Sequence, residues 1–252
     1  LPSIAGIYLR QEVEMLSGLL ENSARPFTVI VGGAKISDKV DAVNNLLGLA
    51  DKVLIGGTVA NVFLKAQGRE LGESFIEDVF VDEKRRVRRD WVVYAEEILE
   101  KYKDKIVCPE DLVIYQEKAL NFTIAENSTL VEKVIDINTE EITAGWIALD
   151  IGPKTRRLFS DIVGKSKTVF LAGPMGKFEN ERFALGSKAI LGAMKDVTKN
   201  FSAKTIIAGG DTIDVARRYA SLDDYSHASL AGGATLEFLA GKSLPALIPL
   251  ME

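Results

Sequence analysis

The sequence predicts an α/β fold, a three-layer Rossmann-like parallel sheet with helices on both faces. Two observations carry this prediction: short apolar segments rich in β-branched residues recur along the chain, and most end at a glycine or proline turn that leads into a helical pattern. The expected strands are residues 27–31, 52–55, 105–108, 146–149, 167–171, 204–207 and 227–230. Strands that alternate with helices form parallel sheets through right-handed crossovers, so their carboxyl ends should share the edge where such sheets bind ligands.

Length and composition limit the class of protein. The 252 residues are 47% hydrophobic and 27% charged, as in a globular protein, and no linker divides them, so we expect one domain over residues 1–252. The net charge of -5 argues against nucleic acid or an anionic membrane as a partner, and no apolar run reaches the ~20 residues that span a bilayer. With one cysteine and no signal-peptide pattern, we expect a cytoplasmic protein, and we expect it to be a monomer.

Three segments lie outside the strand–helix alternation. Residues 7–20 and 82–104 have the apolar spacing of amphipathic helices. The second of these helices would carry a basic run within residues 84–89, which we interpret as a solvated face rather than a nucleic-acid patch, because no aromatic residues are interleaved. Residues 113–142 hold short β-like pieces, which we interpret as an excursion from the main sheet. Cys108 is expected to be a core thiol, because no base lies near it in the sequence.

The first strand ends in the stretch that tells most about function, Gly32-Gly33-Ala34-Lys35-Ile36-Ser37-Asp38-Lys39. We expect a turn at the glycines and then a helix, with Lys35 and Lys39 one turn apart on one face. Free N–H groups at the helix start, the helix dipole and two lysines would favour a polyanion such as a nucleotide triphosphate. On this stretch alone an ordinary strand–helix turn remains the alternative, because glycine after a strand is common.

The common nucleotide-binding motifs do not occur in this sequence. No two glycines are spaced i, i+2, so the fingerprint G-x-G-x-x-G is missing, which argues against a nicotinamide-dependent dehydrogenase. The P-loop and the signature elements of protein kinases are missing too. A nucleotide site in this chain must therefore use a different set of loops.

Taken together, the loops resemble those of phosphoglycerate kinase. The matching segments are Gly32-Gly33-Ala34-Lys35 with the residues that follow to 39, residues 56–66, Cys108-Pro109-Glu110-Asp111, residues 149–155, Gly173-Pro174-Met175-Gly176 with residues 177–179, Gly209-Gly210-Asp211-Thr212, residues 232–239 and residues 241–245. The second segment is closest to archaeal members. The resemblance covers only the C-terminal, nucleotide-binding half of the family. We therefore expect that the N-terminal domain, which binds 3-phosphoglycerate in that family, is missing.

The resemblance implies a site for ATP or ADP with Mg²⁺. Lys35 and Lys39 would contact the phosphates and the transferring phosphoryl group, and Asp211 would meet the nucleotide-bound Mg²⁺. Glu179 would accept hydrogen bonds from the ribose, and Thr212 would approach the terminal phosphate. The other implied nucleotide-binding positions are Gly33, Ala34, Gly56, Gly57, Leu149, Pro174, Lys177, Gly209 and Gly210. The catalytic positions are Lys35, Lys39 and, at a helix start that faces the transferred phosphate, Gly232 and Gly233.

Several positions depart from the family pattern. Ala172 replaces an asparagine, Ala208 a glycine and Leu230-Ala231 a threonine–glycine pair, and each lost charge-assisted hydrogen bond would weaken binding by about 1.5–3 kcal/mol. Lys177 stands where an apolar residue covers the ribose, and we hypothesise that its charge compensates for Ala172. The expected function is that of a phosphoglycerate kinase nucleotide domain that binds Mg-nucleotide without turnover. The alternative is a non-catalytic or regulatory nucleotide-binding protein of the same fold.

Overall fold

A six-stranded parallel sheet forms the centre of the computed structural model, which describes residues 4–82, 87–116 and 131–250. Its strands, in spatial order, are β11 (His227–Ser229), β10 (Lys204–Ala208), β9 (Thr168–Ala172), β1 (Phe27–Val31), β2 (Lys52–Ile55) and β5 (Ile106–Val107). Every neighbouring pair is parallel. The predicted fold class is confirmed, and six of the seven predicted strands lie in this sheet.

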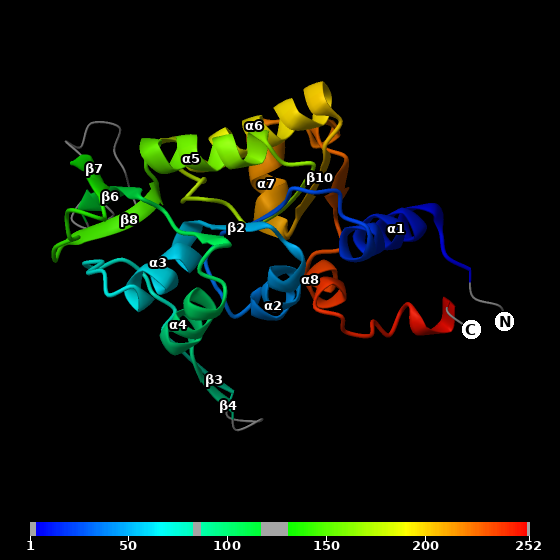
Figure 1. The fold of residues 1–252 in the computed structure, drawn as a ribbon, viewed down its shortest axis with the longest axis horizontal. Coiled ribbons are helices and arrows are strands. Elements are labelled where there is room, and N and C mark those ends of the chain that lie inside the picture. Colours follow the sequence, from blue (N-terminus) through cyan, green and yellow to red (C-terminus); the bar gives the residue numbers. More distant parts are fainter. Residues whose placement is uncertain (1–3, 83–86, 117–130, 251–252) are drawn as a thin grey trace.

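Helices cover both faces of the sheet (Figure 1). Those on one face are α1 (Ile7–Glu21), α2 (Val40–Leu49), α3 (Gly57–Ala66), α4 (Trp91–Lys101) and α8 (Gly233–Leu239), and those on the other are α5 (Pro153–Gly164), α6 (Leu185–Phe201) and α7 (Gly210–Tyr219). Short 3₁₀ helices occupy Glu181–Phe183, Leu222–Asp224 and Ile248–Leu250. The predicted helix over residues 7–20 is confirmed as α1. No helix in the described part of the chain is long and apolar enough to cross a membrane.

The pleat of the strands divides the core into two apolar layers. In β1, Val29 and Val31 pack with α1, α2 and α3, whereas Ile30 packs with α5 and α6. β9 follows the same alternation, because Phe170 belongs to the first layer and Leu171 to the second. Since β1, β9 and most of β10 are covered on both faces, their near-continuous apolar sequences are explained by burial in a parallel sheet.

The seventh predicted strand belongs to a different sheet. β8 (Trp146–Ile151) pairs antiparallel with β6 (Asp111–Gln116), which also pairs antiparallel with β7 (Glu132–Asp136). This three-stranded sheet confirms the predicted excursion, of which residues 117–130 lie outside the described part. The expectation that residues 146–149 join the parallel sheet was wrong, because four apolar residues before a turn do not reveal the direction of the neighbouring strand.

The prediction of a helix over residues 82–104 was also wrong at its start, because α4 begins only at Trp91. A hairpin of β3 (Val79–Asp82) and β4 (Val87–Asp90) precedes α4, and in Figure 1 it projects from the body of the protein. Asp90 is the N-cap of α4, where its carboxylate accepts from the backbone N–H groups of Val92 and Val93. Part of the basic run lies in β4, and residues 84–86 lie outside the described part.

The topology creates a crevice at the carboxyl edge of the central strands. β1 and β9 are neighbours, but the chain leaves β1 toward α2 on one face and leaves β9 toward α6 on the other. At such a switch point the two connections diverge and leave room for a ligand. The glycine loops after β1 and β9 lie at this point.

A buried carboxylate joins the three-stranded sheet to α5. Asp111 on β6 is only 4% exposed, and its oxygens accept from the N–H groups of Lys154 (2.9 Å) and Thr155 (2.7 Å) and from the Thr155 hydroxyl (2.6 Å). Gly152, the N-cap of α5, has no side chain with which to cap the helix. Asp111 therefore satisfies the first N–H groups of α5 from a different element.

We expect Asp111→Ala to lower the free energy of unfolding by about 3 kcal/mol, because it leaves several buried donors without an acceptor. Urea denaturation followed by circular dichroism measures this. Asp136→Ala is the control: the Asp136 carboxylate accepts from Asn138 N–H at 2.9 Å and pairs with Lys154 Nζ at 3.3 Å in a half-exposed position, so a clearly smaller loss is expected. Equal losses for the two variants would contradict the capping role of Asp111.

Candidate functional site

The loops at the carboxyl edge touch through backbone atoms. Gly33 N–H donates to the carbonyl of Pro174 (2.7 Å), and Gly57 N–H donates to the carbonyl of Met175 (3.0 Å). Gly57 has a φ of +58°, and a Cβ there would lie 2.5 Å from the nitrogen of Gly33. A side chain at this point would force the loops after β1, β2 and β9 apart. Glycine is therefore needed here for close packing as well as for its conformation.

Two threonine hydroxyls complete this packing. Thr58 Oγ1 lies 2.8 Å from the carbonyl oxygen of Gly33 and 2.6 Å from that of Ala34. Thr212 Oγ1 is fully buried and accepts from Gly173 N–H at 2.7 Å. Thr58 was not among the predicted site residues. Thr212, which is expected to approach the terminal phosphate, uses its oxygen to accept from the neighbouring loop, and its contact with a phosphate stays a prediction.

Two adjoining cavities open at this edge. One, the apolar pocket, has a volume of about 310 Å³, and its lining includes the β8 residues Ala148 and Leu149 and, after β9, Pro174 and Met175. The other, the polar cavity, has a volume of about 440 Å³. Asp211 lines both, so the two cavities meet at the first turn of α7.

The predicted site residues divide between these cavities. Those on the apolar pocket are Gly33, Ala34, Gly57, Leu149, Pro174, Lys177 and Glu179. Those on the polar cavity are Lys39, Gly209, Gly210, Thr212, Gly232 and Gly233. Gly56 lines neither; a Cβ there would lie 2.4 Å from Met175 Sδ, so Gly56 lets Met175 pack against the start of α3. Residues up to 200 positions apart in the sequence are thus brought to one edge.

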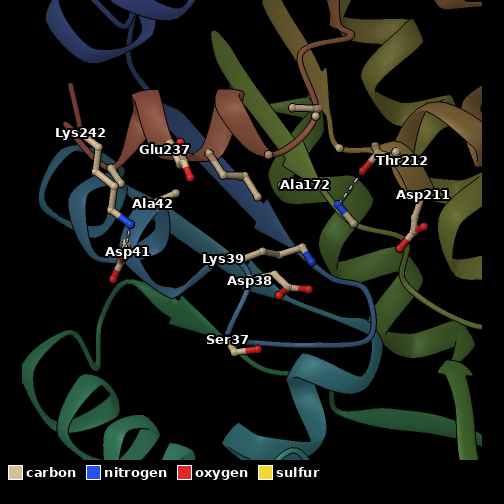
Figure 2. Close-up of a pocket in the computed structure, with 18 residues that line it drawn as sticks. Ser37, Asp38, Lys39, Asp41, Ala42, Ala172, Asp211, Thr212, Glu237 and Lys242 are labelled. Carbon is tan, nitrogen blue, oxygen red and sulfur yellow. Dashed lines mark hydrogen bonds and ion pairs between the residues drawn. The ribbon is translucent and has the colours of Figure 1, made fainter. Parts of the chain in front are cut away.

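Three helices begin at the polar cavity. α2, α7 and α8 have Lys39, Gly209 and Gly232 as N-caps, and none of these three caps its helix with a side-chain hydrogen bond. Some of the first N–H groups already have acceptors: Val40 of α2 donates to the carbonyl of Ile36 (2.9 Å), and Thr235 of α8 donates to that of Gly232 (3.2 Å). It is therefore mainly the helix dipoles that favour an anion here. Figure 2 shows Lys39 extending into the cavity toward the side on which Asp211 and Thr212 lie.

Burial lowers the pKa of the Lys39 ammonium, while the nearby carboxylates of Asp38, Asp211 and Glu77 raise it in part. A half-buried ammonium has lost some of its hydration, so it gains more from contact with an anionic ligand than an exposed one.

The expected helix around both lysines was wrong. α2 begins only at Val40, so Lys35 lies in the loop before it, exposed, and lines neither cavity. A turn closed by Lys39 N–H to the carbonyl of Ile36 comes between them. Glu77 holds this turn, because its Oε2 accepts from the N–H groups of Ile36 (2.6 Å) and Ser37 (3.1 Å). Local sequence could not reveal an acceptor that lies 40 residues further along the chain.

The residues that depart from the family pattern lie in different parts of the structure. Ala172 and Ala208 line the polar cavity, where their methyl groups offer no hydrogen bond. Leu230 is 64% exposed. Lys177 lines the apolar pocket rather than the polar cavity, so compensation for Ala172 by Lys177 would have to act from the neighbouring pocket.

Asp150 is a site residue that the sequence analysis did not single out. It lines the apolar pocket, is 3% exposed, and its carboxylate accepts from the N–H groups of Gly186 (2.7 Å) and Ile151 (2.9 Å). Burial raises the pKa of this carboxyl group to about 7, although those N–H groups and nearby Arg156 favour the charged form. An acid inside an apolar strand, next to the predicted Leu149, was the available signal.

Cys108 is half-buried, and burial raises the pKa of its thiol to about 12. A thiol that stays protonated is a poor nucleophile, which supports the expected role in the core.

The donors present fit a nucleotide-bound magnesium better than a metal held by protein alone. Residues 4–82, 87–116 and 131–250 contain no cluster of three or more His, Cys, Asp or Glu that could hold a metal ion. Asp211 supplies one exposed carboxylate between the two cavities. Mg²⁺ commonly uses one or two carboxylates together with substrate phosphates, which is the arrangement these residues allow.

The switch-point crevice and the glycine loops define an open α/β protein with its candidate site at the carboxyl edge of the sheet. The family model for phosphoglycerate kinase matches residues 1–242, so the chain belongs to the phosphoglycerate kinase family.

Relatives and solved structures agree with this assignment. The chain is 37% identical over 252 residues to phosphoglycerate kinase of Rubrobacter xylanophilus, covering 100% of this chain and 58% of the relative. Against the Macrococcus caseolyticus enzyme it is 40% identical over 247 residues, covering 98% and 56%. Its fold matches phosphoglycerate kinase structures from Coxiella burnetii (TM-score 0.83, 34% identity, 98% of this chain and 58% of that one) and Pyrococcus horikoshii (TM-score 0.79, 33%, 99% and 57%). The chain thus spans less than two thirds of these relatives.

The raised pKa of Asp150 predicts how stability depends on pH. The folded protein binds the Asp150 proton more tightly than the unfolded chain, whose ordinary value is 3.8, so Asp150 lowers the free energy of unfolding as the pH rises from about 4 to about 7. One pKa unit corresponds to about 1.4 kcal/mol, so the decrease is on the order of a few kcal/mol. Asp150→Asn, which cannot ionise, should show a smaller decrease in urea titrations between pH 5 and pH 8.

Asp224→Asn is the control for this experiment. Lys199 and Lys195 lower the pKa of Asp224 to about 2, so its stabilising effect is lost only as the pH falls below about 4. Between pH 5 and pH 8 this variant should parallel the wild type. A parallel curve for Asp150→Asn as well would contradict the role given to Asp150.

Proposed function

We propose that this chain is the nucleotide-binding domain of a phosphoglycerate kinase and binds ADP or ATP with Mg²⁺ across the two cavities. The observation that carries the proposal is their junction at Asp211: an apolar pocket suited to a flat base opens into a polar cavity where three uncapped helices begin. A nucleotide has the same order of parts, an apolar base followed by a charged polyphosphate.

The apolar pocket would take the base between Leu149 and Pro174, with Glu179 at the ribose. Gly33 and Gly57, from the loops after β1 and β2, present no side chain to this pocket, so their backbone could approach the ligand directly. Lys177 on the same pocket adds a positive charge beside the proposed ribose position.

The polar cavity would take the phosphates. Its basic side chains are Lys39 and Lys242, of which Lys242 already pairs with Asp41 (2.6 Å). Its acidic side chains, including Asp211 and Glu237, would repel a bare polyphosphate. Mg²⁺ held by Asp211 and the phosphates would neutralise charge as phosphoryl transfer proceeds. Lys39 would stabilise the same oxygens from the other wall, and Lys35 remains a candidate for contact from the solvent side.

For the whole enzyme we propose phosphoryl transfer between ATP and the carboxylate of 3-phosphoglycerate, as part of glycolysis in the cytoplasm. The protein would position the reactants and neutralise charge without forming a covalent intermediate. The acceptor site would lie in an N-terminal domain beyond this chain, so the domain over residues 1–252 would bind Mg-nucleotide as a monomer with negligible turnover.

A non-catalytic nucleotide-binding protein is the second candidate. Ala172 and Ala208 favour it, because both line the polar cavity with methyl groups. Turnover of ATP that depends on 3-phosphoglycerate, measured on the chain joined to the N-terminal half of a family member, separates the two. Turnover supports the kinase, and nucleotide binding without turnover supports the second candidate.

Calorimetric titration with MgADP tests the site itself. Lys39→Ala should weaken binding at least tenfold, because it removes a half-buried ammonium from the proposed phosphate position. Asp211→Ala should weaken binding with Mg²⁺ but have little effect when EDTA removes the metal. Lys35→Ala should have a smaller effect than Lys39→Ala, since Lys35 lines neither cavity.

Lys52→Ala is the matched lysine control. Its ammonium contacts the carbonyl of Asp104 at 2.6 Å, at the amino end of β2 and away from both cavities, so MgADP affinity should not change. If the wild-type domain does not bind MgADP at millimolar concentration, the proposal is wrong for the isolated domain.

A further inference from the structure

The loop that follows β9 lies along α7 and is fixed to both ends of this helix. At the first turn, Thr212 Oγ1 accepts from Gly173 N–H at 2.7 Å. At the last turn, Tyr219 Oη donates to the carbonyl of Phe178 at 3.0 Å, and Arg218 Nη1 donates to the carbonyl of Glu179 at 3.1 Å. A ten-residue helix is about 15 Å long, so α7 fixes the distance between the two points at which this loop is held.

The two ends of the loop serve different parts of the site. Gly173 lines the polar cavity, whereas Phe178 and Glu179 line the apolar pocket. The last turn of α7 lies outside both cavities, so Arg218 and Tyr219 touch the site only through the carbonyls that they bind.

The Tyr219 ring is itself held in place. It is half-buried and packs against the apolar layer of α5, α6 and α7, and Lys188 Nζ from α6 lies 4.2 Å from its centroid. Because the ring is fixed, its hydroxyl can define where the Phe178 carbonyl lies. Arg218 is exposed and adds a second bond one residue further along the loop.

We propose that Tyr219, assisted by Arg218, is a positioning residue that places Phe178 and Glu179 on the wall of the apolar pocket and so governs affinity for the nucleoside part of the ligand but not for its phosphates. The identity of the ligand in this inference rests on the proposed function. The positioning of the loop rests only on the hydrogen bonds from Tyr219 and Arg218.

Tyr219→Phe tests the proposal, because it removes the hydroxyl and keeps the ring. Calorimetry on the whole chain would compare adenosine, MgADP and inorganic pyrophosphate with Mg²⁺. Affinity for adenosine and for MgADP should fall by about fivefold each, the effect of one neutral hydrogen bond, and affinity for pyrophosphate should not change. A merely structural role would lower all three affinities together.

Tyr225→Phe is the matched control. The Tyr225 hydroxyl likewise donates to a carbonyl, that of Leu191 at 3.4 Å, but Tyr225 is buried and does not line either cavity. This variant should bind all three ligands like the wild type. Unchanged adenosine affinity in Tyr219→Phe, or an equal loss for pyrophosphate, would overturn the inference.

Amide hydrogen exchange makes the result independent of the proposed ligand. The N–H group of Lys177 donates to the carbonyl of Leu149 (2.8 Å), and the N–H group of Phe178 donates to the carbonyl of Gly176 (2.9 Å). Tyr219→Phe should speed exchange at these two amides severalfold and leave the amides of β10 unchanged. If the wild type binds no nucleotide but exchange changes in this way, only the proposed function fails. If exchange does not change, the positioning role fails.

Discussion

The close approach of three backbone loops at the carboxyl edge is the constraint on which the rest of the site depends. Gly33, Gly57 and Gly173 have positive φ angles, and a Cβ on Gly57 or Gly173 would lie less than 3 Å from the backbone of the loop after β1. These contacts fix the distance between the loops after β1, β2 and β9. The positions of Lys39, Leu149 and Asp211 relative to one another follow from this spacing, because each is held on an element that these loops begin or contact.

The loops of the site are held by side chains that are distant from them in the sequence, and local sequence does not encode such contacts. Glu77 holds the turn before Lys39, Asp150 joins β8 to the start of α6, and Tyr219 holds the loop after β9. Each of these side chains acts on backbone donors or acceptors far away in the sequence. The groups proposed to contact the ligand are thus supported by a second set of residues that do not reach the phosphates themselves.

Much of this arrangement could be predicted from the sequence. All six strands of the parallel sheet could be predicted from short apolar runs before turns, because burial on both faces requires such runs. The placement of Lys39 and Asp211 at one edge follows from the shared direction of parallel strands. The antiparallel pairing of residues 146–149 and the hairpin before α4 could not be predicted. Strand direction and the choice between hairpin and helix depend on tertiary partners. Lys35 was misplaced for the same reason, since the carboxylate of Glu77 stabilises a turn where local periodicity suggests helix.

The two outer strands of the central sheet are much shorter than the inner ones. β5 has two residues and β11 has three, whereas β1, β9 and β10 have five each. An edge strand exposes unpaired N–H and C=O groups to which another chain can add, and very short edges offer few of them. The sheet that carries the site is therefore poorly suited to growth by strand addition, so its long, apolar inner strands bring little risk of aggregation once the domain has folded.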